Sequence, residues 1–114
     1  GPAGMKVIKT KLKEIIKEKK IDFTIVNGEN AAENGKGITK KNFKDLIDSG
    51  VDVITSGNHI WDQKEILEII DKEKKLIRPA NLLEGQPGNG YGIYEIKNKK
   101  RSRLYYHRYT RRNN

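Results

Sequence analysis

Apolar positions along the chain switch between helical and strand-like spacing, and polar turns separate the segments. Between Met5 and Lys20 the apolar residues Ile8, Leu12, Ile15 and Ile16 recur at i, i+4, i+7 and i+8. This spacing predicts an amphipathic helix with a lysine-rich solvent face. The short β-rich run 23–26 predicts a strand, and it ends abruptly in a polar turn at 27–30.

A second helix and strand follow the loop at 34–37. Thr39 is a candidate N-cap for a helix that carries Phe43, Leu46 and Ile47 and ends near Gly50. Residues 51–55 predict the next strand, which ends in the polar turn 56–59. The order of these segments is typical of an α/β fold with parallel βαβ units.

A third helix is expected after this turn. Asp62 followed by Glu65 has the spacing of a capping box, and the helix would carry Ile66, Leu67, Ile69 and Ile70. Short strands are expected at 76–77 and 91–96, with a Gly- and Pro-rich loop between them.

The charge is distributed unevenly along the 114 residues. The chain has 24 Lys and Arg against 15 Asp and Glu, a formal net charge of +9. Segment 97–114 holds eight of those basic residues and none of the acids, so residues 5–96 are nearly neutral. We therefore divide the chain into residues 1–4, which look like a cloning remnant, a domain at 5–96 and a basic tail at 97–114.

The tail admits three interpretations. Its interleaved basic and aromatic residues could bind RNA or single-stranded DNA, with Arg on phosphates and Tyr stacked on bases. It could instead be a disordered extension, or residues 104–109 could add an edge strand. The residues that would contact nucleic acid are Arg101, Arg103, Tyr105, Arg108 and Arg111.

Length and composition narrow the function classes. A chain of 114 residues allows one small domain, and the absence of cysteine excludes disulfides and thiolate chemistry. No apolar run reaches the roughly 18 residues of a membrane span, and no signal peptide is recognisable, so we expect a cytoplasmic protein.

Candidate chemistry lies where the first two strands end. Glu29 and Asn30 follow the first strand, and Asn58 and His59 follow the second. Because ligands bind parallel sheets at the carboxyl ends of neighbouring strands, we expect both clusters to face one crevice. Oxygen donors with an imidazole suit a divalent metal and phosphate chemistry. The alternative is that these residues have no function in binding or catalysis. Asn-Gly pairs are common in turns, a loop carboxylate is often only solvated, and a histidine after a strand is often structural.

Four strings in order resemble the YmdB-like metallophosphoesterases of the calcineurin-like superfamily. They are Val-Asn-Gly-Glu-Asn-Ala-Ala at 26–32, Asp-Val-Ile-Thr-Ser-Gly-Asn-His-Ile-Trp-Asp at 52–62, Ile-Arg-Pro-Ala-Asn at 77–81, and Pro-Gly-Asn-Gly-Tyr-Gly at 87–92. The resemblance runs from about Val7 to Ile96. It implies part of an α/β/β/α sandwich and hydrolysis of 2′,3′-cyclic nucleotides or related phosphodiesters.

The resemblance also assigns roles to individual residues. It implies that Glu29 and Asn30 bind one metal ion, that Asn58 binds a second, and that His59 acts at the scissile phosphate. Two ions of Fe, Mn or Mg would be bound in the complete site. Arg78 would be a phosphate contact or the partner in a structural salt bridge.

Two parts of the family pattern have no counterpart here. The family opens with a strand that ends in Gly-Asp-x-x-Gly, whose Asp is a metal ligand, and it draws several His ligands from a later half. The alternative to a phosphodiesterase is therefore a non-catalytic fragment of that fold. It would bind nucleic acid through the tail, or self-associate through an exposed sheet edge as a homo-oligomer.

Overall fold

The computed structural model describes residues 1–80 and 86–96 together with the backbone of 102–106. Its centre is a parallel sheet in the order β1-β2-β3, formed by β1 (Ile25–Asn27), β2 (Val53–Thr55) and β3 (Leu76–Ile77). Ile25 pairs with Val53, and Ile54 pairs with Leu76. The expected parallel α/β fold is confirmed, with the strands within two residues of their predicted ends.

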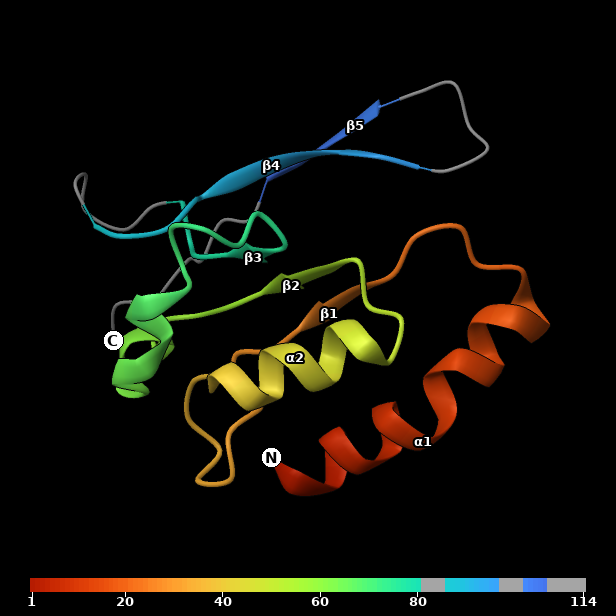
Figure 1. Ribbon diagram of the computed structural model, residues 1–114, viewed down its shortest axis with the longest axis horizontal. Helices are drawn as coiled ribbons and strands as arrows, with labels where there is room; N and C mark the ends of the chain where they lie inside the picture. Colours follow the sequence, from red (N-terminus) through yellow and green to blue (C-terminus); the bar gives the residue numbers. More distant parts are fainter. Residues whose placement is uncertain (81–85, 97–101, 107–114) are drawn as a thin grey trace, which may run out of the picture.

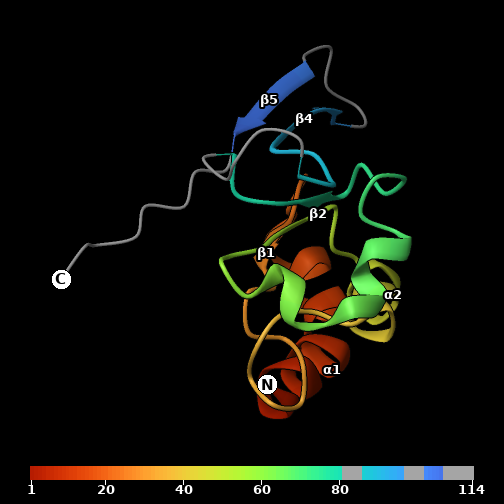
Figure 2. The same ribbon diagram turned by 90° about the vertical axis from the view of Figure 1, so that its left-hand side faces the viewer.

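Two helices cover one side of this sheet, α1 (Pro2–Lys19) and α2 (Lys40–Asp48), while the hairpin β4–β5 lies on the other (Figure 1; Figure 2). Strand β2 is buried on both faces, because Val53 and Ile54 are each 0% exposed. The buried core joins the sheet to both helices through Met5, Leu46, Ile54, Ile66 and Leu76. Within the described chain, no helix is long and apolar enough to cross a membrane.

The N-terminus of α2 is built as the sequence predicts. Thr39 accepts a hydrogen bond from the Asn42 backbone, and the Asn42 side chain accepts one from the Thr39 backbone, each at 3.0 Å. This reciprocal pair satisfies two backbone donors that the first turn leaves without partners. The helix ends at Asp48, and Gly50 follows with a φ of +105°.

Helix α1 begins earlier than expected. It starts at Pro2, so residues 2–4, which we excluded from the fold, form its first turn. Proline is well suited to this position. It has no backbone N–H, and an N–H in the first turn would find no acceptor within the helix. Met5 is buried in the core at 8% exposure. The origin of residues 1–4 as a cloning remnant stays a prediction.

The predicted third helix is wrong. The segment forms two 3₁₀ helices, η1 (Ile60–Asp62) and η2 (Lys64–Glu68), with Gln63 extended between them at φ −100° and ψ 97°. The two side chains of the supposed capping box have other partners. Asp62 contacts His59, and Glu65 accepts a hydrogen bond from the Lys40 backbone at 2.9 Å.

A second link joins η2 to α2 at the surface. Lys40 Nζ lies 2.5 Å from Glu68 Oε2. The hydrogen bond to Glu68 raises the pKa of Lys40, and the same bond lowers the pKa of Glu68. Both side chains are exposed, so this ion pair contributes little to stability.

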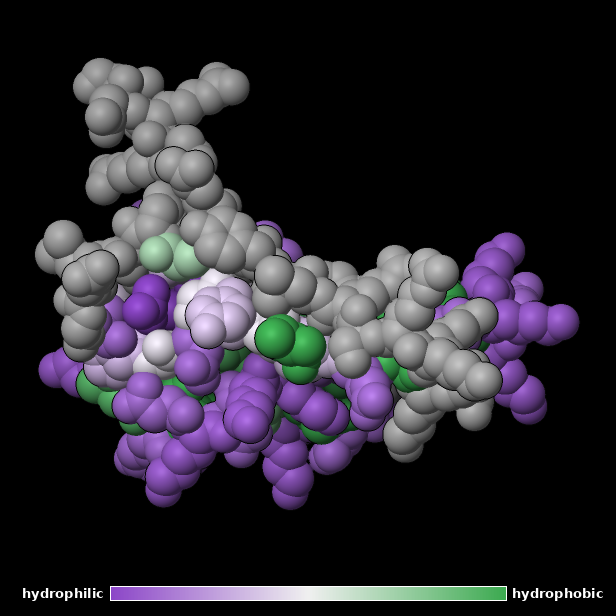
Figure 3. Space-filling view, turned by 90° about the horizontal axis from the view of Figure 1, so that it is seen from above, coloured by the Kyte–Doolittle hydropathy of each residue, from purple (hydrophilic) through white to green (hydrophobic). Residues whose placement is uncertain are grey.

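The hairpin consists of β4 (Tyr91–Glu95) and β5 (Ser102–Tyr106), paired antiparallel with Ile93 opposite Leu104. The predicted last strand is thus confirmed. The edge-strand interpretation of the tail holds in part, since β5 starts and ends earlier than 104–109. Residues 97–101 and 107–114 lie outside the described part, including Arg101, Arg108 and Arg111. From the hairpin side, the described surface is largely hydrophilic with separate apolar residues (Figure 3).

Candidate functional site

The turn after β1 is held against the end of β2. The Gly28 backbone donates to Thr55 O at 2.7 Å, and the Glu29 backbone donates to the Asn27 side chain at 2.8 Å. Gly28 is buried, and a Cβ atom there would lie 2.8 Å from Cγ2 of Ile54. This position therefore requires glycine for the two strand ends to approach.

Glu29 meets the second polar turn directly. Its carboxylate lies against the backbone of Gly57, where any Cβ atom would overlap the Glu29 side chain. Gly57 is itself buried, and Glu29 is half-buried. The structure thus brings Glu29 to the turn that carries Asn58 and His59, as the order of the strands predicts.

Asn30 is exposed and lies on the loop that leaves β1. Its carboxamide is oriented with the nitrogen donating to the carbonyl oxygens of Gly35 at 2.9 Å and Glu29 at 3.2 Å. The Asn30 side-chain oxygen is then the atom that can face a cation.

Asn58 and His59 form the turn before η1. Asn58 is exposed and His59 is half-buried. Nδ1 of His59 lies 2.9 Å from Oδ2 of Asp62. This contact was not predicted, because the spacing of Asp62 and Glu65 indicated a helix cap. Its signal in the sequence is an acid three residues after His59.

The loop at 34–37 packs onto this turn. A Cβ atom at Gly37, whose φ is +76°, would lie 2.6 Å from His59 O. The Gln63 side chain donates to Lys36 O at 3.0 Å and to the Asn34 side chain at 3.3 Å. The backbone of His59 is therefore packed against this loop.

The ends of β2 and β3 are also joined. The buried Ser56 hydroxyl donates to Ile77 O at 2.7 Å. The next residue, Arg78, donates to the carbonyl oxygens of Pro79 and Pro87, each at 2.9 Å. Its described bonds are thus to the backbone of the β3–β4 connection. They do not include the salt bridge that we considered from the sequence, and the phosphate contact stays a prediction.

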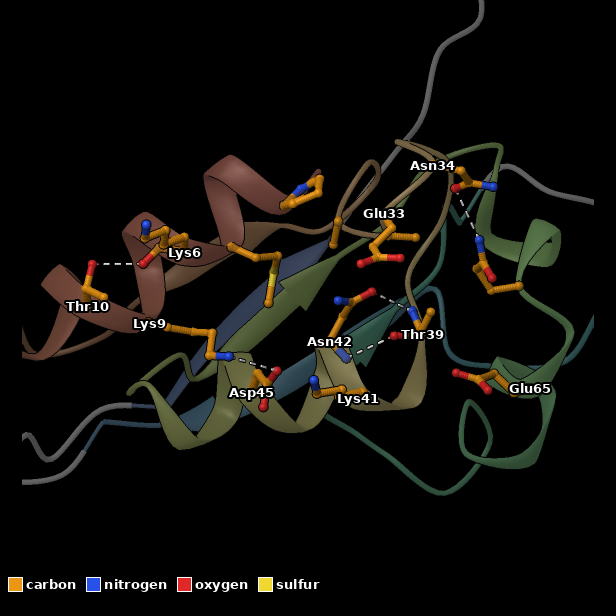
Figure 4. Close-up of a pocket in the computed structure, with 15 residues that line it drawn as sticks. Lys6, Lys9, Thr10, Glu33, Asn34, Thr39, Lys41, Asn42, Asp45 and Glu65 are labelled. Carbon is orange, nitrogen blue, oxygen red and sulfur yellow. Dashed lines mark hydrogen bonds and ion pairs between the residues drawn. The ribbon is translucent and has the colours of Figure 1, made fainter.

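A wide cavity lies apart from the candidate residues at the strand ends. It has a volume of about 810 Å³ and lies between α1, α2 and the loop 31–34 (Figure 4). Its charged walls pair off in part, with Lys9 Nζ 3.5 Å from Asp45 Oδ2. A smaller cavity of about 210 Å³ lies beside β1 and is lined by Asn27, Gly28 and Asn30 among others. We place the candidate site by its chemistry, at the ends of β1 and β2.

The donor set at these strand ends fits part of a metal coordination shell. Glu29 supplies a carboxylate, Asn30 and Asn58 supply amide oxygens, and His59 supplies an imidazole. These groups suit hard or intermediate divalent cations. Among the described residues, no three His, Asp or Glu side chains gather as a metal cage. The described residues therefore match a partial ligand set.

Comparison with known proteins identifies relatives over most of the chain. A 2′,3′-cyclic-nucleotide 2′-phosphodiesterase of Bacillus subtilis is 46% identical over 100 residues, covering 88% of this chain and 38% of the relative. A hypothetical protein of Thermus thermophilus has the same fold with a TM-score of 0.80 at 35% identity, covering 90% of this chain and 38% of that one. A structure described as a novel phosphatase, from Mycoplasma pneumoniae, matches with a TM-score of 0.74 at 36% identity. The match covers 83% of this chain and 35% of that one.

The chain spans a little over a third of the length of these relatives. Residues 1–106 match the family described as YmdB-like protein. The match is longer than the stretch from Val7 to Ile96 on which the sequence resemblance rests. It includes the first four residues and extends through β5, which lies in the segment that we assigned to the basic tail. The chain belongs to the YmdB-like protein family.

Proposed function

We propose that this chain contributes to a metal-dependent phosphodiesterase site, acting on 2′,3′-cyclic nucleotides or related phosphodiesters. The observation that carries the proposal is the contact of Glu29 with Gly57, which joins the polar turns of two neighbouring parallel strands. The 46% identity to a protein named as a 2′,3′-cyclic-nucleotide 2′-phosphodiesterase supports the substrate class. The cytoplasmic location expected from the sequence stays a prediction.

In this proposal Glu29, Asn30 and Asn58 hold divalent metal, which is Fe, Mn or Mg. A divalent cation at such a site supplies charge stabilisation to the phosphate and lowers the pKa of a water molecule. Glu29 provides the only negative charge among the three ligands, so its removal is expected to weaken metal binding most. The close packing of Glu29 on Gly57 limits the positions that its carboxylate can adopt.

His59 acts on the phosphodiester itself. Its Nδ1 faces Asp62, so Nε2 is the nitrogen available to the substrate. A protonated Nε2 would stabilise charge on a phosphate oxygen and donate its proton to the leaving oxygen.

Hydrolysis of 2′,3′-cyclic AMP by the purified chain, with and without Mn²⁺, tests the proposal. We expect Mn²⁺-dependent release of the monophosphate, and we expect it to be lost in Glu29→Gln and in His59→Ala. Asp48→Ala, an exposed change on α2, serves as the matched control. Full hydrolysis by a Glu29→Gln, His59→Ala double variant would reject the proposed site. No hydrolysis by the wild-type chain would reject activity for this chain.

RNA binding by the tail and self-association remain the alternatives. Of the proposed RNA contacts, only Arg103 and Tyr105 lie within a described element, where they pair in register with Tyr94 and Gly92. No described observation favours either alternative over the phosphodiesterase.

A further inference from the structure

We infer that Asp62 is a positioning residue that fixes the tautomer and direction of the His59 ring. This inference deepens the proposed function, on which its catalytic consequence rests. Its structural basis is the 2.9 Å contact between His59 Nδ1 and Asp62 Oδ2. A carboxylate only accepts hydrogen bonds at neutral pH, so this contact requires a proton on Nδ1.

The local backbone explains why the two side chains meet. His59 precedes the 3₁₀ helix η1, and Asp62 is its last residue. In a 3₁₀ turn, side chains three residues apart eclipse each other, whereas an α-helix offsets them. The Asp62 backbone donates to His59 O at 3.0 Å and closes this turn. This 3₁₀ turn is thus what brings the carboxylate to the imidazole.

The turn is anchored on both sides. Ile60, between the two partners, is 1% exposed and belongs to the core. Gly37 packs against His59 O, and Gln63 is tied to the loop at Lys36. The anchored backbone leaves side-chain rotation as the main freedom of His59, and the contact with Asp62 restricts that rotation.

A carboxylate at Nδ1 has a consequence for the opposite nitrogen. It occupies Nδ1 and restricts the ring's rotation, so Nε2 is the nitrogen left for a phosphodiester oxygen. Asp62 need not touch the substrate to act. Its exposed fraction of 39% and that of His59, 37%, leave the pair open to solvent and ligand.

The state of the ring can be read without any catalytic assay. Nitrogen-15 NMR distinguishes the Nδ1–H tautomer from the Nε2–H tautomer of a neutral histidine. A His107→Gln background leaves His59 as the single imidazole, because the chain has two histidines. We expect the Nδ1–H tautomer to dominate in this background and the Nε2–H tautomer to dominate after Asp62→Ala. Asp48→Ala, which removes an exposed aspartate elsewhere, should leave the Nδ1–H tautomer unchanged.

Asp62→Asn is the control for loss of folding in Asp62→Ala. Its amide oxygen can still accept a hydrogen bond from Nδ1, while the negative charge is lost. This variant should keep most of the Nδ1–H tautomer. In a hydrolysis assay, Asp62→Ala should lower kcat by about 10- to 100-fold, the usual effect of losing a carboxylate behind a functional histidine, with KM little changed. Asp62→Asn should lower kcat to a smaller extent.

The outcomes separate this inference from the proposed function. The same tautomer in wild type and in a folded Asp62→Ala variant would overturn the positioning role. Equal kcat in Asp62→Ala and Asp48→Ala would overturn its catalytic consequence. A tautomer that switches as expected in a chain without hydrolysis would support the positioning role and reject only the phosphodiesterase.

Discussion

The carboxylate of Glu29 lies against the backbone of Gly57, in the space that a Cβ atom would fill at that position. The two residues follow neighbouring parallel strands and are far apart in the sequence. Glycine at 57 therefore leaves free the space that the Glu29 carboxylate occupies in this position.

Gly57→Ala is expected to displace Glu29 and weaken metal binding. The added methyl group overlaps the carboxylate, so the Glu29 side chain or the turn must move. Loss of a well-placed ligand or its support typically costs about 10- to 100-fold in metal affinity. Isothermal titration with Mn²⁺ measures the change.

Gly4→Ala is the control for this substitution. Nothing lies within 4 Å of a Cβ atom at Gly4, which is on the surface of α1. Alanine there should raise helix stability by up to about 1 kcal/mol and leave Mn²⁺ affinity unchanged. Equal affinities for Gly57→Ala and Gly4→Ala would contradict the steric argument.

Ser56→Ala is expected to destabilise the fold where β2 meets β3. Ser56 is 1% exposed, and its hydroxyl donates to Ile77 O at 2.7 Å. Removing it leaves a buried carbonyl with one partner fewer, which costs about 1–3 kcal/mol. Urea unfolding gives the change, and Thr10→Ala, an exposed helix hydroxyl, should change stability by less than about 0.5 kcal/mol. A similar change in both variants would show that the bond contributes little.

Thr39→Ala is expected to weaken α2 at its start. The Thr39 side chain accepts from the Asn42 backbone and has no substitute in alanine. Loss of such a cap lowers the free energy of unfolding by about 1 kcal/mol. Thr39→Ser keeps a hydroxyl at this position and should keep most of that stability. Chemical denaturation followed by circular dichroism compares the two variants. The prediction fails if Thr39→Ser loses as much stability as Thr39→Ala.

Tyr94 is expected to make stability fall at high pH. Burial raises the pKa of the Tyr94 hydroxyl, which donates to Lys74 O, and the ring lies 5.8 Å from that of Phe23. Because the pKa is higher in the folded state, the contribution is complete below about pH 10 and is lost as pH rises through the folded pKa. The stability difference between wild type and Tyr94→Phe should therefore be constant up to about pH 9 and shrink between about pH 9 and pH 12. A difference that stays constant from about pH 9 to pH 12 would contradict the prediction.

The sequence predicts the structure correctly where local signals and burial agree. Val53 and Ile54 are apolar in succession and form the buried central strand, and Thr39 forms the cap that its position predicts. The polar turn after each strand also lies where parallel topology requires. These features depend on neighbouring residues or on a general rule of sheet geometry.

The third helix shows where local reasoning fails. Asp62 and Glu65 have capping spacing, but His59 and the Lys40 backbone bind them instead. Lys40 is distant in sequence, so its competition for Glu65 is a tertiary effect that no local pattern records. The contact between Asp62 and His59 is local, yet it depends on a 3₁₀ turn that apolar spacing alone does not predict.

Paramagnetic broadening by Mn²⁺ in the ¹⁵N-labelled chain is the decisive measurement for a metal site at the ends of β1 and β2. Amide signals of residues 28–30 and 57–59 should broaden at lower Mn²⁺ than those around Asp45 and Asp48 on α2. Glu29→Gln should raise the Mn²⁺ concentration required by about tenfold or more. Broadening spread evenly over the surface carboxylates, unchanged by Glu29→Gln, would contradict a metal site at these strand ends.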